Sequence, residues 1–203
     1  MEIDFWFDFS SPYCYPAALE LEQQAQRHQV TINWYACVLG TSHKARTGTA
    51  PLAQPEAPEQ AYTWLDMKRV CGEYGLSFYP PSRHWQGVRL ATRIACWYRD
   101  SDWITDFIHS VFAAGYAQDR NIADEKVLAD CIALAGQDPL VVMDQANSME
   151  ARARLHLQNQ QAIRAGVFEA PFFHVQQEPF AGLHRLSMAV ARAGELSRRY
   201  SVA

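Results

Sequence analysis

The fold is decided near the start of the chain by the stretch Ile3-Asp4-Phe5-Trp6-Phe7-Asp8-Phe9-Ser10-Ser11-Pro12-Tyr13-Cys14. Residues 3–7 are aromatic or β-branched apart from one aspartate, which is typical of a strand covered on both faces. Pro12 directly after a serine predicts a helix start, because proline at the first helical position lacks only an N–H group that would have no partner there. We expect that helix to run to about His28.

A second strand follows this helix. Apolar side chains alternate along it and would share one face: Val30, Ile32, Trp34, Ala36 and Val38. Strand, helix and strand in this order form a βαβ unit, whose two strands are normally parallel.

The middle of the chain is predicted to be a loop followed by helices only. From Gly40 to Pro58 the pattern dissolves, and a long loop inside a compact domain is often functional. The helices are expected at Trp64–Tyr74 (with Gly75 ending it), Gln86–Arg99, Trp103–Gly115, Asp124–Ala135, Asp138–Asn147 and Met149–Ala165. Asp124, Asp138 and Ser148 are the expected N-caps of the last three.

Strand character returns near the C-terminus. Residues 171–175 are short and apolar, Pro179-Phe180 fits an edge strand, and a last helix should run from Leu183 or Arg185 to Tyr200. The outer βαβ and ββα pieces together predict an α/β, thioredoxin-like fold with a large inserted all-helical domain. We place the discontinuous thioredoxin-like domain at residues 1–39 and 148–203, and the inserted domain at 40–147.

Composition excludes several classes of function. Of the 203 residues, 49% are hydrophobic and 20% charged, and the net charge is -4 with the basic residues scattered, so we expect no nucleic-acid surface. We expect neither a signal peptide nor a membrane span. The five cysteines have no paired spacing, which favours reduced thiols in the cytoplasm, and the seven histidines show no metal-ligand spacing.

The chemistry of interest lies at the first helix. In thioredoxin folds the reactive residue sits at its N-terminus, where free N–H groups and about half a positive charge favour an anion. Here Ser11 stands where thiol enzymes place the attacking cysteine, and a serine hydroxyl is a poor nucleophile without a base. The hydroxyl suits a sulfur that arrives on a ligand, for which glutathione is the abundant cytosolic candidate. The alternative for Ser11 is a plain N-cap, and Cys14 fits a buried, inert thiol.

The whole chain resembles the 2-hydroxychromene-2-carboxylate isomerases and their relatives, the kappa-class glutathione transferases. The opening run Asp4–Tyr13 carries this resemblance, together with the stretch Val167-Phe168-Glu169-Ala170-Pro171. Further matching positions are Tyr62, Asp66, Tyr79-Pro80-Pro81, Gly182 and Arg185-Leu186.

The resemblance implies a glutathione-dependent isomerase that acts on an unsaturated aromatic carboxylate or a related conjugated carbonyl, with Ser11 as the catalytic serine. It implies that Ala170, before a cis Pro171, offers backbone hydrogen bonds to glutathione. The segment Ala181-Gly182-Leu183-His184 is similar to the one that grips the γ-glutamyl end. It also implies a homodimer.

Some positions depart from the family pattern. Leu183 and His184 stand where relatives carry a small polar residue and an aspartate able to pair with the glutathione ammonium. Thr49, Ala53 and Glu59 lie where asparagines and a lysine are common. His43 and Lys44 are the candidates for replacing that charge towards substrate, and Trp85 for an aromatic substrate contact.

Other functions stay open beside the isomerase. A kappa-class-like transferase or peroxidase would use the same thiolate site, and a non-catalytic module would bind a thiol ligand without turnover. A disulfide oxidoreductase is disfavoured, because Ser11 replaces the attacking cysteine.

Overall fold

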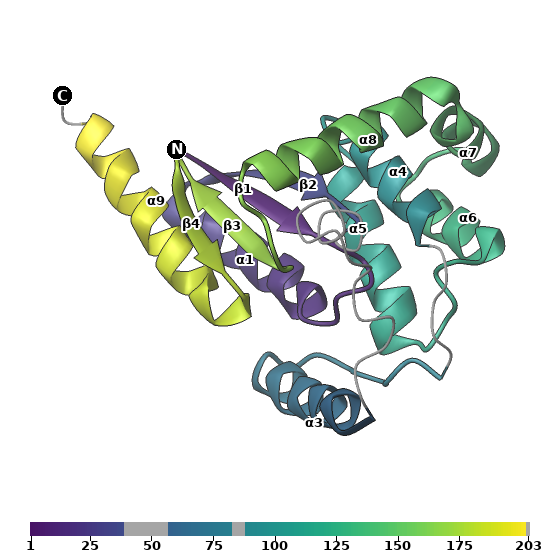
Figure 1. The fold of residues 1–203 in the computed structure, drawn as a ribbon, viewed down its shortest axis with the longest axis horizontal. Coiled ribbons are helices and arrows are strands. Elements are labelled where there is room, and N and C mark those ends of the chain that lie inside the picture. The colour runs from purple at the N-terminus through teal and green to yellow at the C-terminus, as the bar shows by residue number, and fades with distance from the viewer. Residues whose placement is uncertain (39–56, 83–87, 202–203) are drawn as a thin grey trace.

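The computed structural model describes residues 1–38, 57–82 and 88–201, and the predicted substrate residues His43, Lys44 and Trp85 lie outside them. Figure 1 shows a sheet flanked by helices, with a helical block beyond one of its edges. The strands are β1 (Glu2–Phe7), β2 (Thr31–Ala36), β3 (Phe172–Val175) and β4 (Glu178–Ala181). The helices are α1 (Cys14–His28), α3 (Ala57–Glu73), α4 (Arg89–Trp97), α5 (Ile104–Phe112), α6 (Glu125–Leu134), α7 (Pro139–Asn147), α8 (Met149–Arg164) and α9 (Leu186–Ser201), with a π-helix at Ala113–Ala117 and a 3-10 helix at Leu183–Arg185.

The sheet has the strand order β2-β1-β3-β4. β1 pairs in parallel with β2, as the βαβ pattern predicts, and antiparallel with β3, which in turn pairs antiparallel with β4. Phe5 lies opposite Trp34 on one side and Phe173 on the other. The predicted thioredoxin-like α/β fold with a helical insertion is confirmed. The boundaries at 39/40 and 147/148 stay a prediction.

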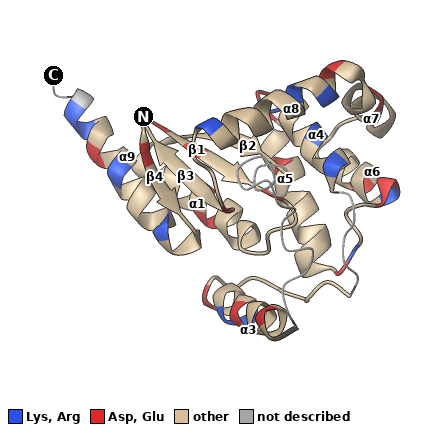
Figure 2. Ribbon diagram, in the orientation of Figure 1, with Lys and Arg blue, Asp and Glu red and all other residues tan. Residues whose placement is uncertain are grey.

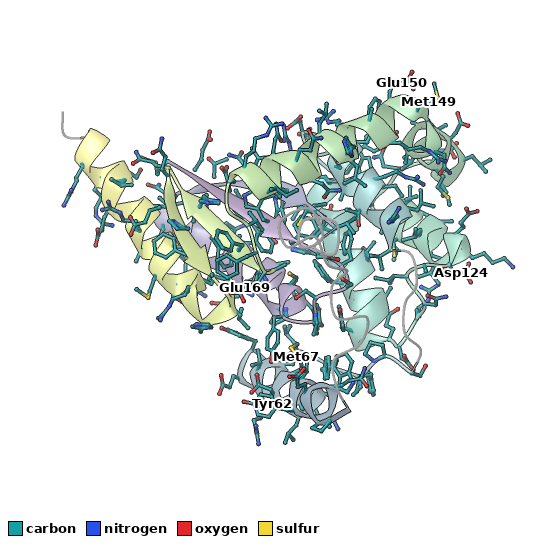
Figure 3. The ribbon with its side chains drawn as sticks, in the orientation of Figure 1. Tyr62, Met67, Asp124, Met149, Glu150 and Glu169 are labelled. Atoms are coloured by element: carbon teal, nitrogen blue, oxygen red, sulfur yellow. The ribbon has the colours of Figure 1, made fainter. Side chains whose placement is uncertain are left out.

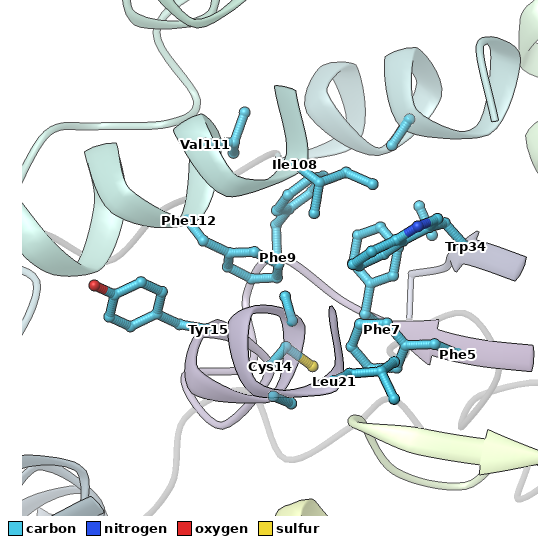
Figure 4. Close-up of a cluster of buried hydrophobic side chains, with 14 of the residues drawn as sticks. Phe5, Phe7, Phe9, Cys14, Tyr15, Leu21, Trp34, Ile108, Val111 and Phe112 are labelled. Atoms are coloured by element: carbon cyan, nitrogen blue, oxygen red, sulfur yellow. The ribbon is translucent and has the colours of Figure 1, made fainter. Parts of the chain in front are cut away.

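An aromatic core joins the sheet to α1 and the helical block (Figure 4). The Phe5 ring stacks on that of Phe173 at 5.2 Å between centroids. Phe9, just beyond β1, lies 4.9 Å from Phe112 of α5 by the same measure. The core therefore continues from the strands into the segment that leads to Ser11.

The opposite face of the sheet is covered by α8. Trp6 and Phe172 are buried there with Ala162 of α8. The Gln158 side chain donates to the Ala36 carbonyl at 2.5 Å, and the Val38 N–H donates to the Asn159 side chain at 3.0 Å. These bonds satisfy polar groups at the end of β2 and attach α8 to it.

Three predicted helix starts are confirmed by their caps. The Asp124 carboxylate accepts from Lys126 N–H at 2.9 Å, Asp138 accepts from Leu140 N–H at 2.8 Å, and the Ser148 hydroxyl accepts from Ala151 N–H at 3.1 Å. Each bond satisfies an N–H group that the helix itself leaves without a partner.

Other element limits differ from the sequence prediction. Pro58 belongs to the first turn of α3 rather than to the loop, because proline is tolerated where no N–H donor is needed. The helix predicted at Trp103–Gly115 is α-helical only to Phe112 and continues as the π-helix Ala113–Ala117. Single-turn π-helices are rare inside α-helices, and no residue of Ala113–Ala117 signals one in the sequence.

Candidate functional site

Ser11 lies in the turn that connects β1 to α1. Its N–H donates to the Asp8 carbonyl at 3.0 Å, and its own carbonyl accepts from Cys14 N–H at 3.1 Å. The helix begins only at Cys14, and its N-cap residue, Tyr13, makes no capping hydrogen bond with its side chain. The prediction that Pro12 is the first helical residue is therefore wrong. Ser11 is not a conventional cap either, because it belongs to the turn that begins at Asp8 and precedes the helix.

The Ser11 hydroxyl contacts the other end of the chain. It donates to the Ala170 carbonyl at 2.6 Å, and the Ala170–Pro171 peptide bond is cis. The turn before α1 and the entry to β3 are thus joined through one side chain. This contact brings together three of the predicted site residues.

Cys14 occupies the second-cysteine position of a Cys-x-x-Cys pattern but is fully buried. Burial raises the pKa of its thiol far above the ordinary value, and hydrogen bonds from the Asp8 backbone and the Ser11 side chain oppose that rise only in part. A buried thiol that stays protonated is a poor nucleophile. The structure agrees with the prediction of an inert Cys14.

A cavity of about 420 Å³ lies beside this junction. Its lining comes from the start of α1, from α3, from the entry to β3 and from the turn after β4: Tyr13, Asp66, Val70, Glu73, Tyr74, Glu169, Ala170, Pro171, Gly182, Leu183 and His184. Five predicted binding residues, at positions 170, 171 and 182–184, therefore lie around one space.

Two predicted residues lie elsewhere. Ser11 is not part of the lining itself but borders it through Ala170 and Tyr13. Ala181 pairs with Phe172 in the sheet and packs with the cluster on the α8 side. Side chains alternate along a strand, so the face taken by Ala181 is opposite to that of Phe180.

The α3 wall of the cavity is fixed to α1 by a hydrogen bond. The Tyr13 hydroxyl donates to the Asp66 carboxylate at 2.8 Å. Burial raises the pKa of Tyr13, and the bond to Asp66 adds to the rise. Met67 and Cys71 are buried on the same helix and anchor it to the core. Tyr13 was not predicted, because only a long-range contact reveals its role.

The turn after β4 requires a glycine. Gly182 has a φ of 84°, a conformation that L side chains rarely adopt, and its N–H donates to the Pro171 carbonyl at 2.9 Å. A Cβ atom there would lie 2.8 Å from Cε1 of His184, since the imidazole folds back over the turn. The backbone and the His184 ring thus form one corner of the cavity.

The described lining is acidic. It contains three carboxylates, Asp66, Glu73 and Glu169, and no lysine or arginine. Figure 2 marks the acidic positions along α3 in red. Lys68 and Arg69 of the same helix do not line the cavity. Within the described ranges, no group of three His, Cys, Asp or Glu side chains is arranged to hold a metal ion.

The fold and this site define a class: a thioredoxin-fold protein with a serine before its first helix, hydrogen-bonded to the residue that precedes a cis-proline. The chain belongs to the DSBA-like thioredoxin domain family, whose model matches residues 2–192. Among residues 1–38, 57–82 and 88–201, no helix is long and apolar enough to cross a bilayer.

Individual relatives align with nearly the full length of the chain and carry a more specific name. The 2-hydroxychromene-2-carboxylate isomerase of Pseudomonas putida is 26% identical over 204 residues, covering 98% of this chain and 97% of the relative. That of Sphingobium xenophagum is 24% identical over 185 residues, covering 91% and 93%. A solved structure of a 2-hydroxychromene-2-carboxylate isomerase superposes with a TM-score of 0.88 at 25% identity, covering 99% of this chain and 98% of that one.

Proposed function

We propose that this protein is a glutathione-dependent isomerase of the 2-hydroxychromene-2-carboxylate isomerase type. Its substrate would be an unsaturated aromatic carboxylate or a related conjugated carbonyl. The observation that carries the proposal is the Ser11 hydroxyl, held 2.6 Å from the Ala170 carbonyl at the border of the cavity. The relatives that align over nearly the full chain are named 2-hydroxychromene-2-carboxylate isomerase, and this name supports isomerisation as the type of reaction.

The residues around the cavity suit a small peptide thiol. A volume of about 420 Å³ lies in the range of small-molecule sites. The Tyr13 N–H donates to no acceptor in the described part of the chain, so it is free for a sulfur near Ser11. Ala170 and Gly182 present backbone near the start of β3, where an extended peptide would bind.

When bound, glutathione would supply the thiolate that adds to the conjugated double bond, lets it rotate as a single bond and then leaves. Ser11 has one hydroxyl proton, which points to the Ala170 carbonyl. With the proton there, Oγ can accept a hydrogen bond from a thiol. Rotation about the Cβ–Oγ bond turns the same proton towards the sulfur position, where it stabilises negative charge.

The α1 terminus adds to this stabilisation. The helix begins at Cys14, so its positive end lies close to Ser11 and Tyr13. Buried aromatic side chains behind the turn, Phe9 and Tyr116, exclude water from that side. The Tyr116 hydroxyl donates to the Phe9 carbonyl at 3.1 Å and holds the segment that precedes Ser11.

The direct test is an isomerisation assay. 2-Hydroxychromene-2-carboxylate is incubated with the protein, and its absorbance is followed as it equilibrates with the ring-opened isomer, with and without glutathione. Catalysis that requires glutathione and is blocked by S-methylglutathione supports the proposal. Glutathione binding by calorimetry without any turnover of this or related conjugated substrates would refute an isomerase.

A glutathione transferase or peroxidase is the second candidate, and one observation favours it. The described lining carries three carboxylates and no Lys or Arg, which suits a neutral electrophile better than an anionic substrate. Assays with a neutral aromatic electrophile and an organic hydroperoxide separate this activity from isomerisation. Thiol binding without any of these reactions would leave a binding module.

The homodimer and the cytoplasmic location are part of the same proposal. Sedimentation of the purified protein measures its oligomeric state. Fractionation of the cells that make the protein measures its location.

A further inference from the structure

We infer that Glu169 is the residue that binds the γ-glutamyl ammonium of glutathione, in place of the aspartate that relatives carry at the position of His184. The inference rests on the proposed function, because it assigns one end of the same ligand. The cationic group it predicts is a primary amine.

Glu169 lies beside the turn that the resemblance assigns to the γ-glutamyl end. Its Oε1 atom is 3.4 Å from the point where a Cβ of Gly182 would be, and Nδ1 of His184 is 3.1 Å from that same point. Carboxylate and imidazole therefore lie on the same small region of the turn. Figure 3 shows Glu169 at the end of the sheet that faces α3, the helix carrying Tyr62 and Met67.

The Glu169 carboxylate lacks a hydrogen-bonding or ionic partner among the described residues. It makes no hydrogen bond or ion pair with any residue in the described parts of the chain, although its side chain is half-buried. A partly desolvated carboxylate gains from a cation that also donates hydrogen bonds. An ammonium provides both.

The other two carboxylates of the cavity are less suitable. Asp66 already accepts the Tyr13 hydroxyl, which occupies one of its oxygens. Glu73 is exposed at the end of α3, where water screens its charge. His184 contributes an acceptor only while neutral, and its exposed ring would give a weaker partner for a cation.

The position of Glu169 along the chain links both ends of the ligand. The next residue, Ala170, meets the Ser11 hydroxyl, and Pro171 accepts the Gly182 N–H. One short segment therefore reaches both the sulfur position and the turn after β4. A tripeptide thiol lying along residues 169–171 would place its amine near Glu169 with its sulfur near Ser11.

The test is calorimetric titration with two ligands, glutathione and its analogue in which hydrogen replaces the α-amino group. In the wild type, glutathione should bind about tenfold or more tightly than the analogue, as expected of a charge-assisted hydrogen bond. Glu169→Gln keeps the shape of the side chain and should weaken glutathione about tenfold while leaving the analogue unchanged. Glu195→Gln, an exposed carboxylate of α9 that does not line the cavity, is the control and should change neither affinity more than about twofold.

The outcomes separate the two proposals. If glutathione binds but Glu169→Gln leaves it unchanged, or weakens both ligands equally, the assignment of Glu169 is wrong while thiol binding stands. If neither ligand binds the wild type at millimolar concentration, the proposed function fails and the inference fails with it. An unchanged thermal midpoint for Glu169→Gln confirms that the variant is folded.

Discussion

The two walls of the cavity are built in different ways. The wall beside Ser11 is held by two backbone hydrogen bonds, from Ser11 N–H to the Asp8 carbonyl and from Gly182 N–H to the Pro171 carbonyl. The 2.6 Å bond from the Ser11 hydroxyl to the Ala170 carbonyl adds to them. The α3 wall is held by two buried side chains and the Tyr13–Asp66 bond, and its Tyr62 side chain is 60% exposed. Rigid support suits the side on which we propose the chemistry, whereas a helix with fewer attachments suits the side on which we propose that substrates enter.

The largest expected effect comes from a substitution in the wall beside Ser11. Ser11→Ala removes the hydroxyl donor next to the proposed sulfur position and should lower kcat/KM about 100- to 1,000-fold, the range seen for single donors to a developing anion. The thermal midpoint should hardly move, since one partly exposed hydrogen bond stabilises a protein by about 1 kcal/mol. Kinetics and thermal melts measure both.

The control for this variant is Ser187→Ala, which removes an exposed hydroxyl that accepts a hydrogen bond from the Gln24 side chain at 3.0 Å. It should leave activity unchanged. A Ser11→Ala protein with full activity and a large loss of stability would show that Ser11 is structural.

A smaller effect is expected on the α3 wall. Met67 is fully buried, and Met67→Ala should lower the free energy of unfolding by about 2–3 kcal/mol. We expect the low end of the range for such substitutions, because a helix at the surface can move towards the gap. Urea unfolding measures this loss.

Met188→Ala is the matched control, because Met188 is 53% exposed. It should stay within about 0.5 kcal/mol of the wild type.

Hydrogen exchange should show the α3 amides of Met67→Ala opening first. Uniform opening of α3 and α1 would remove the contrast between the walls.

The bond that joins the walls should give an effect near 1 kcal/mol. Tyr13→Phe, Asp66→Asn and the double variant form a cycle whose coupling free energy reports the Tyr13–Asp66 bond. Partial exposure of both groups reduces the value expected for a hydrogen bond to a charge. Coupling near zero would mean that α3 is held by Met67 and Cys71 alone.

The smallest effect depends on pH. Burial raises the pKa of Cys71 from its ordinary value of 9.0 to about 11, so the folded state keeps the proton that the unfolded state loses. The stabilisation is complete below pH 9 and is lost as pH rises from 9 towards 11. Replacing Cys71 by Ala should reduce the fall in unfolding free energy between pH 9 and 10 by less than about 1 kcal/mol. An identical fall in both proteins would show that the Cys71 thiol is accessible in the folded state.

Much of the fold could be predicted because its signals are local. Alternation from Val30 to Val38 indicates β2, and Asp124, Asp138 and Ser148 mark helix starts with their own side chains. The helix α1 begins two residues after the predicted start, because a serine before proline also suits the turn that Asp8 organises.

The candidate site was less predictable, because its contacts join distant segments. The resemblance led to Ser11, Ala170 and the turn at Gly182, but nothing local marks Glu169 or the Tyr13–Asp66 bond. Ala181 was grouped with its neighbours in sequence, although strand alternation turns it to the other face of the sheet.

The two edge strands of the sheet, β2 and β4, limit how a strand of another chain could pair with it. At one end, Pro179 contributes no N–H to the outer edge of β4. At the other, Gln158 and Asn159 of α8 hold the end of β2. An additional strand could therefore not pair fully with β4, because Pro179 offers it no N–H, and α8 already occupies the end of β2.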